Sequence, residues 1–237
     1  MKKVIIITGA SSGIGKSIGN YLTEKGYIVY GTSRKPEKYP KSEFTLIKSD
    51  INKKSDTRDL VNHVTTIEGK IDVLINNAGI GYTGPVEESR IEDIESLFST
   101  NFFGPIEMIK KILPVMRKNN GGLIINITSI AGYIGLPFRG IFCASKSALE
   151  ILTESLRSEI KDYGIKVVNV APGDVKTDVV SRRIDSFNDK NFFLLLASSL
   201  FIAVILYYFL LNISASLLHS AAKRSLLGEN KFSKIII

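Results

Sequence analysis

Residues 4–15 read Val-Ile-Ile-Ile-Thr-Gly-Ala-Ser-Ser-Gly-Ile-Gly, and this stretch decides the fold. Four apolar β-branched residues indicate a short strand that is buried on both faces. The glycines after it allow a tight turn and a close approach of the backbone to a phosphate group, and a helix pattern begins directly behind them. The order of strand, glycine-rich turn and helix predicts the first unit of a dinucleotide-binding fold. The alternative interpretation is a purely structural turn.

Short apolar segments alternate with segments of helical periodicity along most of the chain. We expect strands at residues 3–8, 27–32, 44–48, 71–75, 123–128 and 166–170. We expect helices near residues 15–25, 56–68, 91–118 and 142–163. Strands that are nearly all apolar belong to a parallel sheet with helices on both faces. The predicted fold class is therefore α/β, with a doubly wound, Rossmann-like sheet.

Composition and charge exclude several classes of protein. The chain has 237 residues, of which 44% are hydrophobic, and this length suits one domain with a large core. The formal charge is +8, but the basic residues are scattered, so we expect no nucleic-acid partner. The single cysteine, Cys143, excludes an internal disulfide, and His63 and His219 are too few for a metal site.

The two ends of the chain bear on its location. The apolar run at residues 4–7 is too short for a signal peptide and leads into the glycine turn, so we expect the catalytic portion to lie in the cytoplasm. The composition changes after Lys190. We therefore divide the chain into a dinucleotide-binding domain, residues 1–190, and a hydrophobic C-terminal segment with a basic tail, residues 191–237.

Residues 192–211 carry no charge. A helix of twenty residues spans about 30 Å, which is the thickness of a bilayer core. These residues predict a transmembrane or membrane-associated helix that holds the catalytic domain at a membrane. The alternative is a buried helix of a soluble cytoplasmic protein, at the interface of a homo-oligomer. A disrupted reading frame after Lys190 would also explain the change in composition.

The end of the second predicted strand selects the cofactor. In the dinucleotide-binding fold an acid there binds the ribose 2′-OH, whereas a cation accommodates a 2′-phosphate. Ser33, Arg34 and Lys35 stand at this place, and no acid occurs before Glu37. A guanidinium binds two phosphate oxygens at once. The sequence therefore predicts NADP(H), and the alternative interpretation is a solvated basic turn.

Three motifs extend the pattern, namely Thr8-Gly-x-x-x-Gly-x-Gly15, Asn76-Asn-Ala-Gly79 and Pro172-Gly-x-x-x-Thr177. Together they make residues 3–180 resemble the short-chain dehydrogenase/reductase family. The resemblance implies these cofactor contacts: Thr8, Gly9, Ser11, Ser12, Gly13, Ile14, Gly15, Ser33, Arg34, Lys35, Asp50, Asn77, Ala78, Gly79, Lys146, Pro172, Gly173, Val175 and Thr177. Asp50 would contact the adenine ring, and its alternative role is that of a turn or cap residue.

The resemblance also implies a catalytic centre of Asn, Ser, Tyr and Lys. Asn101 would help to hold a proton-relay water beside a bend in its helix. Ser129 would bind the substrate oxygen, and Lys146 would bind the nicotinamide ribose and lower the pKa of the tyrosine. Phe142 occupies the tyrosine position, thirteen residues after Ser129 and four before Lys146. Four residues apart on a helix, Phe142 and Lys146 share one face.

Compared with the tyrosine that the resemblance implies, Phe142 keeps the volume of the aromatic ring and lacks the acidic hydroxyl. The loss of a positioned general acid costs about 10²–10⁴ in rate. The resemblance thus implies an NADP(H)-dependent oxidoreductase, impaired by Phe142, that transfers a hydride between the nicotinamide and a small carbonyl or alcohol substrate. The alternatives are a non-catalytic NADP(H)-binding pseudoenzyme and a membrane-tethered scaffold. The phenylalanine is either natural or an isosteric substitution. Tyr133 is expected to be a loop aromatic at the substrate pocket and not a replacement donor.

Overall fold

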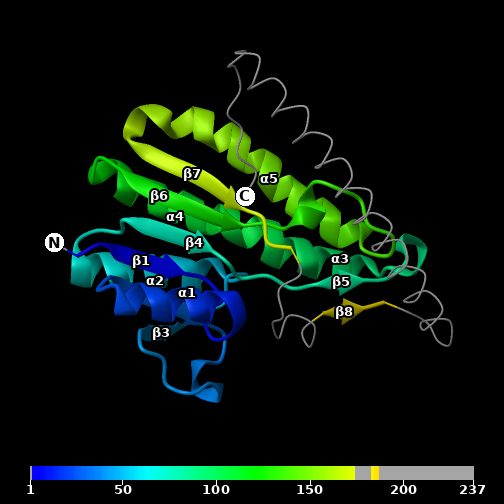
Figure 1. Cartoon of the computed structure of the whole chain (residues 1–237), viewed down its shortest axis with the longest axis horizontal. Helices are drawn as coiled ribbons and strands as arrows, with labels where there is room; N and C mark the ends of the chain where they lie inside the picture. Colours follow the sequence, from blue (N-terminus) through cyan, green and yellow to red (C-terminus); the bar gives the residue numbers. More distant parts are fainter. Residues whose placement is uncertain (1, 174–182, 187–237) are drawn as a thin grey trace, which may run out of the picture. The chain divides into compact units, whose positions relative to one another are not determined.

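The computed structural model describes residues 2–173 and 183–186 of the chain (Figure 1). Its main sheet has six strands in the order β3-β2-β1-β4-β6-β7, and all neighbouring pairs are parallel. The strands are β1 (Val4–Ile7), β2 (Ile28–Ser33), β3 (Thr45–Lys48), β4 (Val73–Asn76), β6 (Gly122–Ile127) and β7 (Ile165–Val170). The predicted parallel α/β sheet is confirmed, with strand ends within two residues of those expected.

Helices connect the parallel strands. They are α1 (Gly13–Glu24), α2 (Lys54–Glu68), α3 (Ile91–Phe98), α4 (Gly104–Lys118) and α5 (Gly140–Ile160). Short 3-10 turns occupy Pro36–Lys38, Val86–Glu88, Ile130–Gly132 and Lys161–Tyr163. The α2 helix ends at Gly69, which has a φ of 73° and donates its N–H to the carbonyl of Thr65. This left-handed residue stops the helix just before β4.

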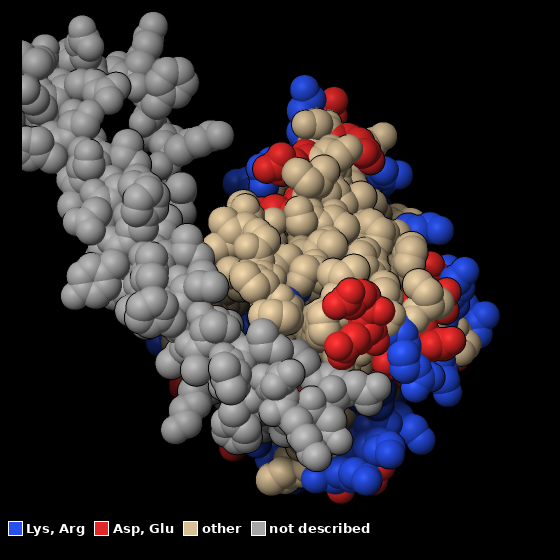
Figure 2. All heavy atoms as spheres, turned by 90° about the vertical axis from the view of Figure 1, so that its right-hand side faces the viewer, with Lys and Arg blue, Asp and Glu red and all other residues tan. Residues whose placement is uncertain are grey.

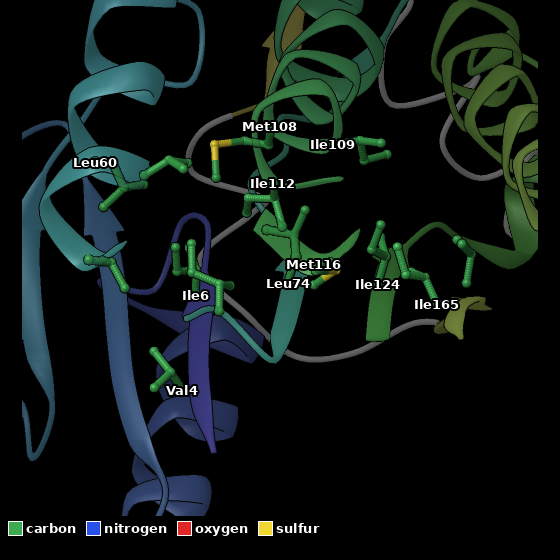
Figure 3. Packing of buried hydrophobic residues seen from close by; sticks show 14 of the residues in the cluster. Val4, Ile6, Leu60, Leu74, Met108, Ile109, Ile112, Met116, Ile124 and Ile165 are labelled. Atoms are coloured by element: carbon green, nitrogen blue, oxygen red, sulfur yellow. The ribbon is translucent and has the colours of Figure 1, made fainter. Parts of the chain in front are cut away.

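The central strands β1 and β4 are apolar and buried on both sides because helices cover both faces of the sheet there. On one face, side chains of α2, α4 and α5 pack over the strands, as Figure 3 shows for Leu60, Met108 and Ile112 above Ile6 and Leu74. On the other face, α1 packs over the alternate strand residues, among them Ile5, Ile7, Val29 and Ile75. Successive residues of β1 therefore enter opposite halves of the core.

The order of the strands locates the site. The chain builds the sheet outward from β1 to β3 and then returns to place β4 on the other side of β1. In open α/β sheets, ligands bind at the carboxyl ends of the strands where this reversal occurs. Thr8 follows β1 and Asn77 follows β4, so the motif residues lie on either side of the reversal.

Two features differ from the expected elements. The predicted helix at residues 91–118 is two helices, because a π-helical turn at Ser99–Phe103 separates α3 from α4. The sequence analysis also missed β5 (Tyr82–Thr83) and β8 (Ile184–Asp185), which pair in a small second sheet. Strands of two residues are too short to show any periodicity.

The prediction for residues 192–211 lies outside the described residues, as does the division at residue 190. Residues 1–187 form one unit and residues 188–237 another, and every described residue belongs to the first. Within residues 2–173 and 183–186, no helix combines the length and the apolar character that a membrane span requires.

Candidate active site

The loop after β4 holds the glycine-rich turn between β1 and α1. Thr8 Oγ1 accepts hydrogen bonds of 3.0 Å from the backbone N–H groups of both Asn77 and Ala78. The Asn77 side-chain amide donates to the carbonyls of Thr8 and Gly9, also at 3.0 Å. A Cβ atom on Gly15 would lie 2.4 Å from the Asn77 amide nitrogen and 2.7 Å from the Gly9 carbonyl oxygen. Only glycine lets α1 begin this close to the turn.

The start of α1 offers backbone donors. Gly9 and Gly13 have φ values of 67° and 55°, which bend the chain from β1 into the helix. Ser11 is buried, and Ser12 directly precedes the first helical residue. The first N–H groups of a helix lack partners within it and attract phosphate groups. Gly13 and Ile14, which we predicted to contact the pyrophosphate, stand at this position.

The basic residues after β2 lie beside the glycine turn. The Gly9 N–H donates to Thr32 Oγ1 at 3.2 Å, which joins the turn to the end of β2. Ser33 is buried, and its hydroxyl accepts the N–H of Lys35 at 3.3 Å. The side chains of Arg34 and Lys35 are exposed, and neither forms an ion pair within the described residues. Both cations are accessible to an anionic ligand.

Asp50 makes the contacts of a turn residue. Its Oδ1 accepts the N–H of Asn52 at 3.1 Å, and its own N–H donates to Asp56 Oδ2 at 3.0 Å. The hydrogen bond from Asp50 lowers the pKa of the Asp56 carboxyl below its usual value. These contacts are those of a turn or cap residue, which was the alternative role of Asp50. The contact of Asp50 with an adenine ring stays a prediction.

Asn101 lies in the π-helical turn, where its side chain is buried. Its Oδ1 accepts the N–H of Ile80 at 2.9 Å, and its Nδ2 donates to the Ile80 carbonyl at 3.0 Å and to Ser145 Oγ at 3.1 Å. Ser145 in turn donates to the carbonyl of Phe142 at 2.8 Å. The π-turn supplies the expected bend, and Asn101 joins the β4 loop to α5.

Lys146 is buried one helical turn after Phe142. Its Nζ donates to the Ile127 carbonyl at 2.9 Å and lies 3.6 Å from the position of a Cβ atom on Gly79. The same position lies 3.3 Å from Asn101 Oδ1, so Gly79, Asn101 and Lys146 meet at one point. Burial lowers the pKa of the Lys146 ammonium to about 8. Such a group titrates close to physiological pH.

Ser129 follows β6, and its hydroxyl is half-buried. Its Oγ accepts the N–H of Ala131 at 3.2 Å, which begins the short 3-10 turn behind it. The next residue, Ile130, donates its N–H to the Pro172 carbonyl at 3.1 Å. The loops after β6 and β7 are thereby joined, and Pro172 and Gly173 lie beside Ser129. The predicted cofactor contacts Val175 and Thr177 lie outside the described residues.

The ring of Phe142 is 9% exposed and packs with Tyr82, Leu97 and Ala131. The Tyr82 hydroxyl is buried and has no hydrogen-bond partner within the described part of the chain. Neither Tyr82 nor Ser145 was predicted: Tyr82 belongs to no motif, and Ser145 is one of the residues between Phe142 and Lys146 to which no role was given. Their place in the site depends on how β5 and the π-turn pack against α5.

Tyr133 is not available as a replacement donor. Its side chain is 62% exposed, and its hydroxyl donates to a carboxylate oxygen of Glu150. That hydrogen bond raises the pKa of Tyr133 to about 12. A phenol that binds its proton this firmly is a poor acid for a carbonyl oxygen.

The geometry and the motif spacing agree with one family. A family model for short chain dehydrogenases matches residues 3–186. The chain belongs to the short-chain dehydrogenase family. The resemblance stated from the motifs is thus confirmed, and with it the class of oxidoreductase and the nucleotide-binding fold.

Two characterised members of the short-chain dehydrogenase family are similar to this chain. The 3-ketodihydrosphingosine reductase of Bacteroides thetaiotaomicron is 44% identical over 182 residues, which cover 76% of this chain and 67% of that protein. The NADPH-dependent 3-dehydrocapnine reductase of Ornithobacterium rhinotracheale is 33% identical over 187 residues, which cover 73% of this chain and 66% of that protein.

Solved structures of the family show the same fold. A short-chain dehydrogenase from Streptomyces avermitilis has a TM-score of 0.74 at 32% identity, covering 80% of this chain and 72% of that one. A tyrosine-to-phenylalanine variant of ElxO with NADPH bound has a TM-score of 0.71 at 33% identity, covering 76% and 77%. A Burkholderia phymatum enzyme in complex with NAD has a TM-score of 0.72 at 26% identity, covering 76% and 69%. Structural neighbours thus bind either nicotinamide cofactor.

Proposed function

We propose that this short-chain dehydrogenase binds NADP(H) and interconverts a carbonyl and an alcohol, at a rate that Phe142 limits. The observation that carries the proposal is the convergence of Gly79, Asn101 and Lys146, whose Nζ lies 6.0 Å from the centroid of the Phe142 ring. The members of this group come from the β4 loop, the π-turn and α5. Such a meeting of distant polar side chains is typical of a catalytic site.

The residues of the site fit a nicotinamide cofactor. The α1 N-terminus and the glycine turn would receive the pyrophosphate, and the exposed Arg34 and Lys35 would receive a 2′-phosphate. Asn77, Ala78 and Gly79 line the path from the turn toward Lys146. A bound nicotinamide would supply or accept the hydride.

The side chains of the site would then handle the oxygen and its proton. The Ser129 hydroxyl would donate a hydrogen bond to the substrate oxygen, and the Lys146 ammonium would stabilise negative charge that develops nearby. Phe142 offers no proton, so the proton would have to come from water. A positioned acid is worth about 10²–10⁴ in rate, and slow turnover is the expected consequence.

Arg34 is expected to give a preference for NADPH over NADH of at least about tenfold in dissociation constant, or about 1.4 kcal/mol. Titration of cofactor fluorescence with both dinucleotides measures it. Arg34→Ala should reduce the ratio severalfold because a bidentate contact with the 2′-phosphate is lost. Arg58→Ala, which removes an exposed arginine on α2, is the control and should leave the ratio unchanged. Equal affinities for the two cofactors would rule out the proposed phosphate contact.

The rim of the site suggests the class of substrate, and we propose an amphiphile whose long apolar chain leaves the site over this rim. Exposed apolar side chains lie on the segments near the site, namely Val86 before α3, Ile91 at the start of α3, and Ile130 and Ile134 after β6. Val86 Cγ2 lies 3.7 Å from a Cβ position on Gly140, which is two residues before Phe142. Figure 2 shows a broad area without charged side chains on the side of the molecule where β5 and α3 lie in Figure 1.

The names of two relatives support this class, since one is a 3-ketodihydrosphingosine reductase and the other a 3-dehydrocapnine reductase. Burial of each additional CH₂ group contributes about 0.8 kcal/mol, or roughly fourfold in affinity. If the apolar chain of the substrate lies along the rim, kcat/KM should increase with the length of that chain until the rim is covered.

The test compares 3-keto compounds of increasing chain length, with the Phe142→Tyr variant as the enzyme. We expect kcat/KM to rise at least about a hundredfold over the series. Val86→Lys should reduce kcat/KM for the long compounds by tenfold or more and leave the short ones unchanged. Ile67→Lys places the same charge on the exposed face of α2 and is the control. Equal rates for short and long ketones would contradict the substrate class and leave the oxidoreductase function standing.

A further inference from the structure

Arg139 stands directly before α5, and its guanidinium lies over the ring at the catalytic position. The guanidinium carbon is 4.8 Å from the centroid of the Phe142 ring. The Nε atom of Arg139 is buried and finds no hydrogen-bond partner among the residues that the structure describes. The face of the aromatic ring is therefore the contact that orients this cation.

A second cation lies near the same ring. Lys146 Nζ is 6.0 Å from the Phe142 centroid. Arg139 immediately precedes α5 and Lys146 lies one helical turn after position 142, so two cations lie near this ring. Tyr82 from β5 and Cys143 from α5 belong to the buried cluster that contains the ring.

We propose that Arg139 is a positioning residue for the proton donor that position 142 is built to carry, and that it lowers the pKa of a phenol placed there. The proposal rests on the proposed function, because Arg139 would act through the proton donor of that reaction. Two cations would then act on the proton donor, and Arg139 lies nearer to the ring centroid than Lys146 does.

The two cations differ in the pH range over which they act. A cation about 4–6 Å from an acid favours its ionised form and lowers its pKa. Burial lowers the pKa of Lys146 to about 8, so its charge fades as the pH rises through 8. A guanidinium keeps its proton at any pH at which proteins are folded. Arg139 therefore maintains a positive charge beside the ring when Lys146 has become neutral.

Burial of the ring works in the opposite direction. A phenol on a ring that is 9% exposed loses hydration of its ionised form, which raises its pKa. Without Arg139, the cation that remains near the phenol is Lys146, 6.0 Å from the ring centroid, beside the buried cluster of Tyr82, Leu97, Ala131 and Cys143. Removing the guanidinium should therefore move the pKa upward by at least about one unit.

The experiment measures the phenol directly, by ultraviolet absorbance of its ionised form during a pH titration. Phe142→Tyr is recorded against the protein with Phe142, whose other tyrosines cancel in the difference. The difference between the Phe142 protein and its Phe142→Tyr variant is then measured again with Arg139→Gln added to both proteins, and once more with Arg139→Lys added to both. With Arg139→Gln, we expect the pKa of the phenol at position 142 to be at least one unit higher. With Arg139→Lys, we expect this pKa to stay close to its value with Arg139, because the positive charge is retained.

A matched control and a second variant complete the design. Arg117 lies 4.4 Å over the Tyr163 ring on the outside of α4, and Arg117→Gln should leave the phenol at position 142 unchanged. If Arg139→Gln does not fold, Arg139→Met keeps the length of the stem and serves in its place. A phenol pKa that stays within 0.3 unit without the guanidinium would overturn the proposal.

Turnover separates this inference from the proposed function. In Phe142→Tyr, the apparent pKa in the pH profile of kcat should move in the same direction as the phenol when Arg139 is replaced, with the affinity for NADPH unchanged. A shifted phenol in a protein that reduces no carbonyl would refute the oxidoreductase function alone. Full activity with an unshifted phenol would refute the role of Arg139 alone.

Discussion

Phe142→Tyr is expected to raise the turnover of carbonyl reduction at least a hundredfold. The substitution adds one hydroxyl to a ring that is already held in place by Tyr82, Leu97 and Ala131. Lys146 and Arg139 flank that ring and would favour the ionised form of the phenol. A positioned general acid contributes about 10²–10⁴ in rate, which corresponds to roughly 3–5 kcal/mol of barrier.

The measurement is the rate of NADPH oxidation by the protein with Phe142 and by its Phe142→Tyr variant, at saturating cofactor and with a panel of ketones. Phe103→Tyr adds the same hydroxyl to an exposed ring at the end of the π-turn and should give no gain. Phe142→Tyr with Lys146→Met should lose most of the gain. A protein with Phe142 that is as fast as its tyrosine variant would show that another group donates the proton.

Gly15→Ala is expected to weaken NADPH binding at least a hundredfold, or about 2.7 kcal/mol. The added Cβ would lie 2.7 Å from the Gly9 carbonyl oxygen and 2.4 Å from the Asn77 amide nitrogen. Asn77 cannot turn away freely, because the same amide donates to the carbonyls of Thr8 and Gly9. The start of α1 must therefore move away from the turn, and the donors for the phosphates move with it.

The expected change in stability provides a second test of Gly15→Ala. Alanine in a helix interior is favoured over glycine by about 1 kcal/mol, so without the steric clash Gly15→Ala would stabilise the protein. We expect a lower melting temperature together with the lost affinity. Gly135→Ala is the control, because nothing lies within 4 Å of the added Cβ there. A stable Gly15→Ala protein with unchanged affinity would contradict the packing described for the turn.

The local pattern of the sequence was sufficient for the architecture. The order of apolar strand, glycine turn and helix at residues 4–15 depends only on residues close in the chain, and these residues form β1 and the start of α1. The spacing of four between Phe142 and Lys146 likewise determines that both side chains share a helix face. The class of oxidoreductase was implied by the resemblance of these motifs to a known family, and each of the three quoted motifs lies within a short segment of the chain.

Contacts between elements could not be predicted in this way. Asn101 reaches Ile80 and Ser145 only because a π-turn interrupts the expected helix at 91–118 and turns its side chain inward. A bend beside Asn101 was expected, but the sequence did not indicate that it would be a π-turn or which residues the Asn101 side chain would reach. The tertiary structure decided this part of the catalytic centre.

The electrostatic setting of position 142 is likewise a tertiary property. The sequence shows that Arg139 precedes Phe142, yet the stacking of its guanidinium on the ring depends on the backbone before α5, where Arg139 is not yet helical. The burial that lowers the pKa of Lys146 comes from the strands and loops that close around it. Periodicity by itself determined which residues share an element, whereas distances, burial and charge at the site required the packing of several elements at once.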